Sequence, residues 1–139
     1  MKKAKYKFAR IKNKLPFFAE VEIEAESSEK FEVRLNCSGV GFTSQGYLEE
    51  VPKAGYDDWK TGAKRGIEFA ARQAAGSNCL VTVSAIRGLG TDTNPVIVAA
   101  ASAFAFWDAV DFQPDKNLKG KIEAKVFSSW QNQNEFFNW

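Results

Sequence analysis

Few residues in this 139-residue chain have side chains suited to catalysis, and their types restrict the reactions it could perform. The sequence contains no histidine, which excludes a Ser-His-Asp or Cys-His nucleophile, an imidazole metal ligand and a histidine general base. The two cysteines, Cys37 and Cys79, are too few to complete a tetrahedral zinc site. Both lie in segments with the alternation of strands, so we expect buried free thiols in preference to a disulfide or a reactive site.

The acidic residues that could move protons are scattered along the chain. Asp57 and Asp58 stand at the start of a helical pattern, where aspartates usually serve as N-caps. Residues 92–94 are too short for a calcium loop, which needs later ligands and a terminal glutamate. Asp108 and Asp111 lie near the end of the second predicted helix, where we expect solvent exposure. None stands beside a candidate nucleophile, so we predict a protein that is not an enzyme and uses no metal or cofactor.

Glycines gather in two segments where backbone amides could approach a ligand. The first contains Gly39, Gly41 and Gly46. No Gly-Lys-Ser/Thr follows it, which excludes a nucleotide-binding P-loop, and turns or a bulge are the favoured interpretation. The second segment is a tight loop between a predicted strand and a helix, Gly88-Leu89-Gly90-Thr91-Asp92.

Basic residues fall into two groups, and each has two interpretations. Lys3, Lys5 and Lys7 alternate with apolar residues, which predicts a strand whose basic face lies beside the glutamate face of the next strand. That face is either neutralised by the glutamates or a nucleic-acid patch. The second group lines the outer side of a predicted helix as an anion-binding stripe or a solvated face: Lys60, Lys64, Arg65 and Arg72. The net charge of +2 is too small to imply a polyanionic partner.

The elements that must position these residues follow from hydrophobic periodicity. Three strands with period-two alternation come first, and an α-β-α-β series follows. The expected strands span residues 3–8, 18–26, 31–37, 78–87 and 121–127, with a short additional strand within 46–50, and the expected helices span 57–75 and 95–110.

This order predicts one α+β domain over residues 1–139, a two-layer sandwich with a mostly antiparallel sheet and two helices on one face. We divide it into a three-stranded meander (1–37), a β-α-β-α-β part (39–127) and an aromatic C-terminal tail (128–139). Within the first helix, Gly62, Gly66 and Ala70 are four residues apart, which predicts close approach to a neighbour, plausibly the second helix.

The second helix opens with Pro95 after a capping Thr93 or Asn94, and it carries no charge as far as Trp107. Such a helix is either buried on most sides or half of a partner interface. The C-terminal aromatics have the same two interpretations, packing on the body or forming a contact surface: Trp130, Phe136, Phe137 and Trp139. The helix is too short to span a bilayer, and no apolar signal segment follows Met1, so we expect a cytoplasmic protein without a membrane role.

Several short motifs between residues 39 and 127 occur in the same order as in a known protein family. Val51-Pro52 precedes the first predicted helix, which contains Arg65-Gly66-Ile67-Glu68 and Ala70. The strand at 80–87 follows, then Asp92 in the loop, and then Ala105-Phe106 with Asp108 and Ala109 in the second predicted helix. A looser match is Gly39-x-Gly41 with Gly46. In this order the motifs resemble domain IV of translation elongation factor G.

The resemblance implies the ribosomal protein S5 domain 2-like fold, with a βαβ crossover of uncommon left hand. In that family the tip loops contact tRNA and messenger RNA at the decoding centre. The corresponding loops here are residues 38–46 and 88–93, with the candidates Gly39, Gly41, Gly88, Leu89, Gly90, Thr91 and Asp92. The chain departs from the family at the tip histidine, whose place falls at about Leu89, and it has no GTPase domain.

Two binding functions follow from these observations. The first is a non-catalytic module that binds RNA or the ribosome through Lys3, Lys5, Lys7, Lys64, Arg65, Arg72 and Arg87. The alternative is a protein-interaction module, including a homodimer, with contacts through Trp107, Trp130, Phe136, Phe137 and Trp139. Lysines left unpaired and continuous with Arg65 would favour RNA, whereas lysines lying beside glutamates would favour the protein partner.

Overall fold

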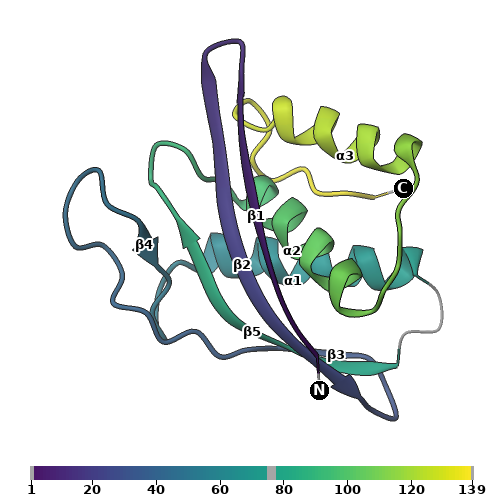
Figure 1. The fold of residues 1–139 in the computed structure, drawn as a ribbon. Helices are drawn as coiled ribbons and strands as arrows, with labels where there is room; N and C mark the ends of the chain where they lie inside the picture. The colour runs from purple at the N-terminus through teal and green to yellow at the C-terminus, as the bar shows by residue number, and fades with distance from the viewer. Residues whose placement is uncertain (1, 75–77, 139) are drawn as a thin grey trace.

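The computed structural model describes residues 2–74 and 78–138, which form a five-stranded sheet with three helices (Figure 1). In chain order the elements are β1 (Lys2–Lys12), β2 (Leu15–Ser27), β3 (Glu32–Leu35), β4 (Glu49–Glu50), α1 (Asp57–Gln73), β5 (Cys79–Gly88), α2 (Pro95–Ala109) and α3 (Lys116–Phe127). The α+β class and the two-layer arrangement are as the sequence predicts.

The sheet has the strand order β1-β2-β5-β3, and β4 pairs with the far end of β5. Pairing is antiparallel for β1–β2, β2–β5 and β4–β5, and parallel for β3–β5. The prediction of a three-stranded meander over residues 1–37 is therefore wrong, because β5 lies between β2 and β3. Alternation of apolar residues reveals which face of a strand is buried, but it does not reveal which strand lies beside it.

The β1–β2 hairpin is the longest feature of the sheet and extends beyond the other strands in Figure 1. Its turn residues Asn13 and Lys14 have φ angles of 52° and 64°, the left-handed conformation that a two-residue hairpin turn requires. In the resulting register Lys3 faces Glu24, and the lysines at positions 5 and 7 face Glu22 and Glu20. The predicted basic strand thus lies beside the predicted acidic one.

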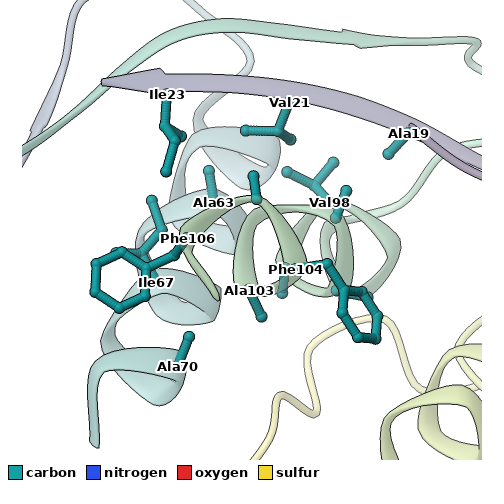
Figure 2. Packing of buried hydrophobic residues seen from close by; sticks show 14 of the residues in the cluster. Ala19, Val21, Ile23, Ala63, Ile67, Ala70, Val98, Ala103, Phe104 and Phe106 are labelled. Carbon is teal, nitrogen blue, oxygen red and sulfur yellow. The ribbon is translucent and has the colours of Figure 1, made fainter. Parts of the chain in front are cut away.

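Helix α2 occupies the centre of the molecule, where it packs against β1, β2 and α1 (Figure 2). Helix α1 lies in the same helical layer and contacts β3 and β5. Asn94 caps it, since its side-chain oxygen accepts a hydrogen bond from the amide of Ile97 at 3.0 Å. Every α2 residue except Asp108 is buried. The uncharged composition therefore reflects burial on nearly all sides, and the interpretation of α2 as half of a partner interface is wrong.

Close packing of α1 on α2 explains the spaced glycines. A Cβ atom built on Gly62 would overlap the carbonyl oxygen of Pro95, and one on Gly66 would overlap that of Ala99. The indole Nε1 of Trp107 donates to the carbonyl of Ala70 at 3.0 Å. The predicted close approach of the two helices is confirmed. At the N-terminus of α1, Asp57 and Asp58 lie in the first turn and do not cap the helix.

The segment predicted as a final strand, residues 121–127, belongs to helix α3. Asp115 caps this helix by accepting a hydrogen bond from the amide of Leu118 at 2.8 Å. Ile122 and Val126 are buried and four residues apart, whereas Ala124, inward in a strand register, is exposed. Over so short a stretch the apolar residues fit both the helical period of 3.6 residues and the strand period of two. The N-cap residue Asp115 was the signal that favours a helix.

The C-terminal aromatics pack on the body of the protein. Trp130 donates from Nε1 to the carbonyl of Pro16 at 3.1 Å, and Phe137 is 4% exposed with its ring centroid 5.1 Å from that of Phe69. Phe136 is half-buried against the same core. With the 1% exposure of Trp107, these positions are packing residues, which is the first of the two interpretations of the C-terminal aromatics, and they do not form the alternative contact surface. Trp139 lies outside the described residues.

Candidate interaction surface

The two glycine segments meet at one end of the sheet, where β4 joins them. The amides of Gly39 and Gly41 donate to the carbonyls of Val51 and Glu50, at 2.9 and 2.8 Å. Glu49 of β4 lies opposite Gly88 of β5. We call this end of the molecule, formed by residues 38–50 and 88–93, the loop end. It brings together the tip-loop residues selected from the sequence.

Thr93 and Asp92 hold the second loop in place. The hydroxyl of Thr93 donates to the carbonyl of Phe18 at 2.6 Å and accepts from the amide of Leu89 at 2.9 Å. The carbonyl of Asp92 accepts from the amide of Phe18 at 2.8 Å. Thr93 is 4% exposed, so the loop is anchored to β2 by a buried side chain. Gly90, at the tip, remains exposed and donates to the carboxylate of Glu49 at 3.1 Å.

Arg87 lies at the centre of a carboxylate cluster on the open face of the sheet. Its guanidinium contacts Glu20 at 2.8 Å and Glu50 at 2.6 Å, and it also pairs with Glu22. Burial lowers the pKa of Arg87, but the hydrogen bonds that its guanidinium donates to Glu22, Glu50 and Glu20 outweigh this effect and raise the pKa. The cation joins β5 to β2 and β4 through these three carboxylates, whose charges oppose the approach of a phosphate.

Tyr56 connects β4 to the start of α1. Its hydroxyl donates to Glu49 at 2.6 Å, and its ring packs on Trp59 with a centroid distance of 5.1 Å. Burial, together with the hydrogen bond to Glu49 and the charge of that carboxylate, raises the pKa of Tyr56 to about 12. The backbone of Tyr56 is left-handed, with a φ of 57°, which is uncommon for an aromatic residue.

The loop end exposes apolar side chains that sequence reasoning missed. Val40, Phe42, Tyr47 and Leu48 are 81%, 63%, 68% and 47% exposed. A cluster of large exposed apolar side chains on one loop is unusual unless it contacts something. The available signal was their position: Val40 and Phe42 are apolar residues in a glycine-rich loop, outside any predicted helix or strand. The glycines of this loop suggested a role for its backbone amides, so the apolar side chains between them were not selected.

Several carboxylates lie at the same end of the molecule as this apolar loop. Besides the three that bind Arg87, they come from β4, from the first turn of α1 and from the second loop: Glu49, Asp57, Asp58 and Asp92. An open hollow of about 580 Å³ beside Gly90 is lined by Asp57, Asp58 and the rings of Tyr56, Trp59 and Trp130. The loop end is therefore apolar at its tip and acidic at its margin.

The basic residues selected from the sequence lie on two separate parts of the molecule, the open face of the sheet and helix α1. Lys3, Lys5 and Lys7 are exposed on the open face of the sheet, and Lys3 lies 3.9 Å from Glu24. Among the described residues no carboxylate lies within 4.0 Å of the other two lysines, because the glutamates opposite them turn to Arg87. The remaining three, Lys64, Arg65 and Arg72, are exposed on α1 in the helical layer. The lysine strand is thus not continuous with Arg65.

The two cysteine thiols are not placed as a reactive site. Cys37 and Cys79 are buried and free, as predicted, and burial raises the pKa of each, which disfavours a reactive thiolate. In the part of the chain that the structure describes, no helix combines the length and apolar character needed to cross a membrane.

Comparison with known proteins identifies a fold and no family. No family model and no curated protein sequence matches this chain. Among solved structures, it is similar to the crystal structure of ttk003000868 from Thermus thermophilus, with a TM-score of 0.64 and 11% sequence identity. The match covers 79% of this chain and 16% of that chain, so this protein corresponds to a small part of a longer one. At this identity the likeness shows the fold alone.

Proposed function

We propose that this protein is a non-catalytic protein-interaction module that binds its partner through the loop end. The observation that carries this proposal is the exposure of Val40, Phe42, Tyr47 and Leu48 on a loop whose backbone is tied to β4. A loop anchored in this way loses little conformational entropy on binding. Because carboxylates lie at the same end of the molecule as the apolar tip, the partner is expected to present an apolar pocket with basic residues at its margin.

The charge arrangement favours this proposal over RNA binding at the same loops. Arg87 is held by three glutamates, and the carboxylates at the margin would repel phosphates. The lysines of β1 lie opposite glutamates in the strand register, which is the arrangement expected for a protein-interaction module. The two buried cysteines would remain reduced in the cytoplasm, where we place the module.

The test compares proteins captured from lysate of the producing organism by the wild-type chain and by a Phe42→Ser/Tyr47→Ser variant. We expect a specific partner to be lost with the variant and retained after RNase treatment. The matched control is Lys64→Gln/Arg65→Gln, which changes two exposed residues on α1 and is expected to retain the partner. Capture that survives the loop variant, or that disappears with RNase, would contradict the proposal.

RNA binding is a second candidate function, and it would use a different surface. Lys5 and Lys7 are exposed and lie more than 4.0 Å from any carboxylate among the described residues. The motifs shared with elongation factor G domain IV support the same candidate, as does a βαβ connection between the parallel neighbours β3 and β5 with α1 between them. Titration of structured RNA against tryptophan fluorescence at low and moderate salt tests it: affinity should fall by decades with salt and should need both lysines.

A further inference from the structure

Strand β1 forms one edge of the sheet, and in the part of the chain that the structure describes no second strand pairs with its outer side. Among the described residues, β1 pairs only with β2, and no backbone hydrogen bond from a loop or helix reaches its outer side. The strand is 11 residues long, which is long for an uncovered edge. Such an edge offers a row of amides and carbonyls to an added strand, which natural proteins usually prevent by shortening, twisting or charging it.

Side chains of β1 alternate between two different surroundings. Lys3, Lys5 and Lys7 project from the open face, where β2 places glutamates opposite them. Tyr6 and Phe8 project toward the helices, and Phe8 is 0% exposed. A strand added on the outer side would meet the same two surroundings. By the logic that already pairs β1 with β2, it would carry acidic residues opposite the lysines and apolar residues toward the helices.

A cavity of about 190 Å³ lies beneath this edge and is lined by aromatic rings. Tyr6 and Phe8 of β1 contribute to it, with Phe104 and Trp107 of α2 and Phe112 from the following turn. Neighbouring ring centroids in this row are 5.0 to 5.7 Å apart. A cavity of about 150 Å³ is known to hold benzene, so one phenyl group fits here.

The charged side chains that also line the cavity cancel one another. Arg10 lies 4.0 Å from Glu123. Burial raises the pKa of Asp108, and the nearby charge of Lys119 lowers it to a smaller extent. A lining with two charges of each sign has no preference for an ion. The occupant of the cavity is therefore expected to be an uncharged aromatic or aliphatic side chain.

From these features we propose that β1 binds an extended acidic peptide of a partner protein by strand addition. Glutamates of the peptide pair with Lys3, Lys5 and Lys7, and one apolar side chain enters the aromatic cavity beneath the edge. Backbone hydrogen bonds to β1 supply affinity, and the cavity and lysines supply specificity. This surface is distinct from the loop end, so the protein carries two interaction surfaces at different places on the sheet.

A second copy of this chain is a poor occupant of the same edge. Antiparallel pairing of β1 with β1 on a two-fold axis would bring the lysine rows of the two copies together on one face. Like charges directly opposite one another destabilise a strand pair. The lysines thus select an acidic strand and reject self-association.

The test uses the full chain and the capped peptide Glu-Val-Glu-Phe-Glu-Val-Glu, with binding followed by amide NMR shifts and calorimetry. We expect shifts in β1 and at the Trp107 indole. A strand presents alternate amides to its two sides, so two N-methylated versions of the peptide, each blocking one set, separate strand addition from other modes. One version should lose binding and the other should bind within about threefold of the parent.

Variants of the protein complete the test. Lys5→Gln/Lys7→Gln should weaken the peptide about fivefold, while Lys64→Gln/Arg65→Gln, with the same loss of charge on α1, should leave it unchanged. Four results would overturn the proposal: no binding at about 1 mM peptide, equal effects of the two N-methylated peptides, equal weakening by the two variants, or displacement of the peptide from β1 by poly-uridylate. The last result would make the lysine row a nucleic-acid contact.

Discussion

Arg87 joins carboxylates from two strands, so its removal leaves Glu20, Glu22 and Glu50 facing one another. We expect Arg87→Ala to lower the free energy of unfolding by about 2 kcal/mol in urea titrations at neutral pH. Breaking a fully buried pair costs about 3–5 kcal/mol, and the value is smaller here because the arginine side chain is 24% exposed. Arg87→Lys keeps the charge but loses the planar, forked guanidinium, so its free energy of unfolding should lie between those of the wild type and Arg87→Ala. An unchanged stability for Arg87→Ala would show that the cluster is incidental.

Tyr56 provides a prediction about pH. Its pKa is raised to about 12 in the folded protein, whereas an unfolded tyrosine titrates near about 10. Between these values the unfolded state has lost the proton and the folded state keeps it, so stability falls as pH rises through this window. The stabilisation is fully present below about pH 10. Urea unfolding of wild type and Tyr56→Phe between pH 8 and 12 should show their stability difference shrinking at the alkaline end; a constant difference would contradict the assignment.

At the scale of elements, the contact between α1 and α2 requires glycine. Gly66→Ala would place a Cβ against the backbone carbonyl of Ala99, which cannot move aside as a side chain could. Overpacking of this kind costs about 1–3 kcal/mol, which exceeds the helix propensity of about 1 kcal/mol that alanine adds. Thermal unfolding should therefore show a lower midpoint for this variant.

Gly120 of α3 is the matched control, since nothing lies within 4 Å of a Cβ at that position. Gly120→Ala should raise stability by about 0.5–1 kcal/mol through helix propensity alone. Stabilisation by both substitutions would mean that the two helices are not in close contact.

At the scale of the whole molecule, the distribution of charge predicts a monomer. The long edge of β1 carries lysines, the apolar helix α2 is enclosed, and the loop end carries carboxylates, so no surface complements itself. Sedimentation equilibrium at micromolar concentration should give the 15.5 kDa mass of one chain. A dimer would contradict this prediction and would restore the homodimeric form of the interaction module.

Part of this structure could be read from local pattern. The alternation of charge in β1 and β2 predicted their shared face, and the glycine spacing in α1 predicted its contact with α2. Pairing between neighbouring strands and contacts along one helix depend on residues a few positions apart, which is the range over which periodicity carries information.

The neighbours of β3, the helical state of α3 and the exposure of Phe42 were decided by tertiary structure. Strand β3 joins β5, a strand far along the chain, so that Glu32 lies opposite Leu80 and Leu35 lies opposite Val83. The sequence by itself determined which faces are apolar, since that property belongs to each segment alone. Which faces meet, and which apolar side chains stay in water, depends on long-range packing that no single segment contains.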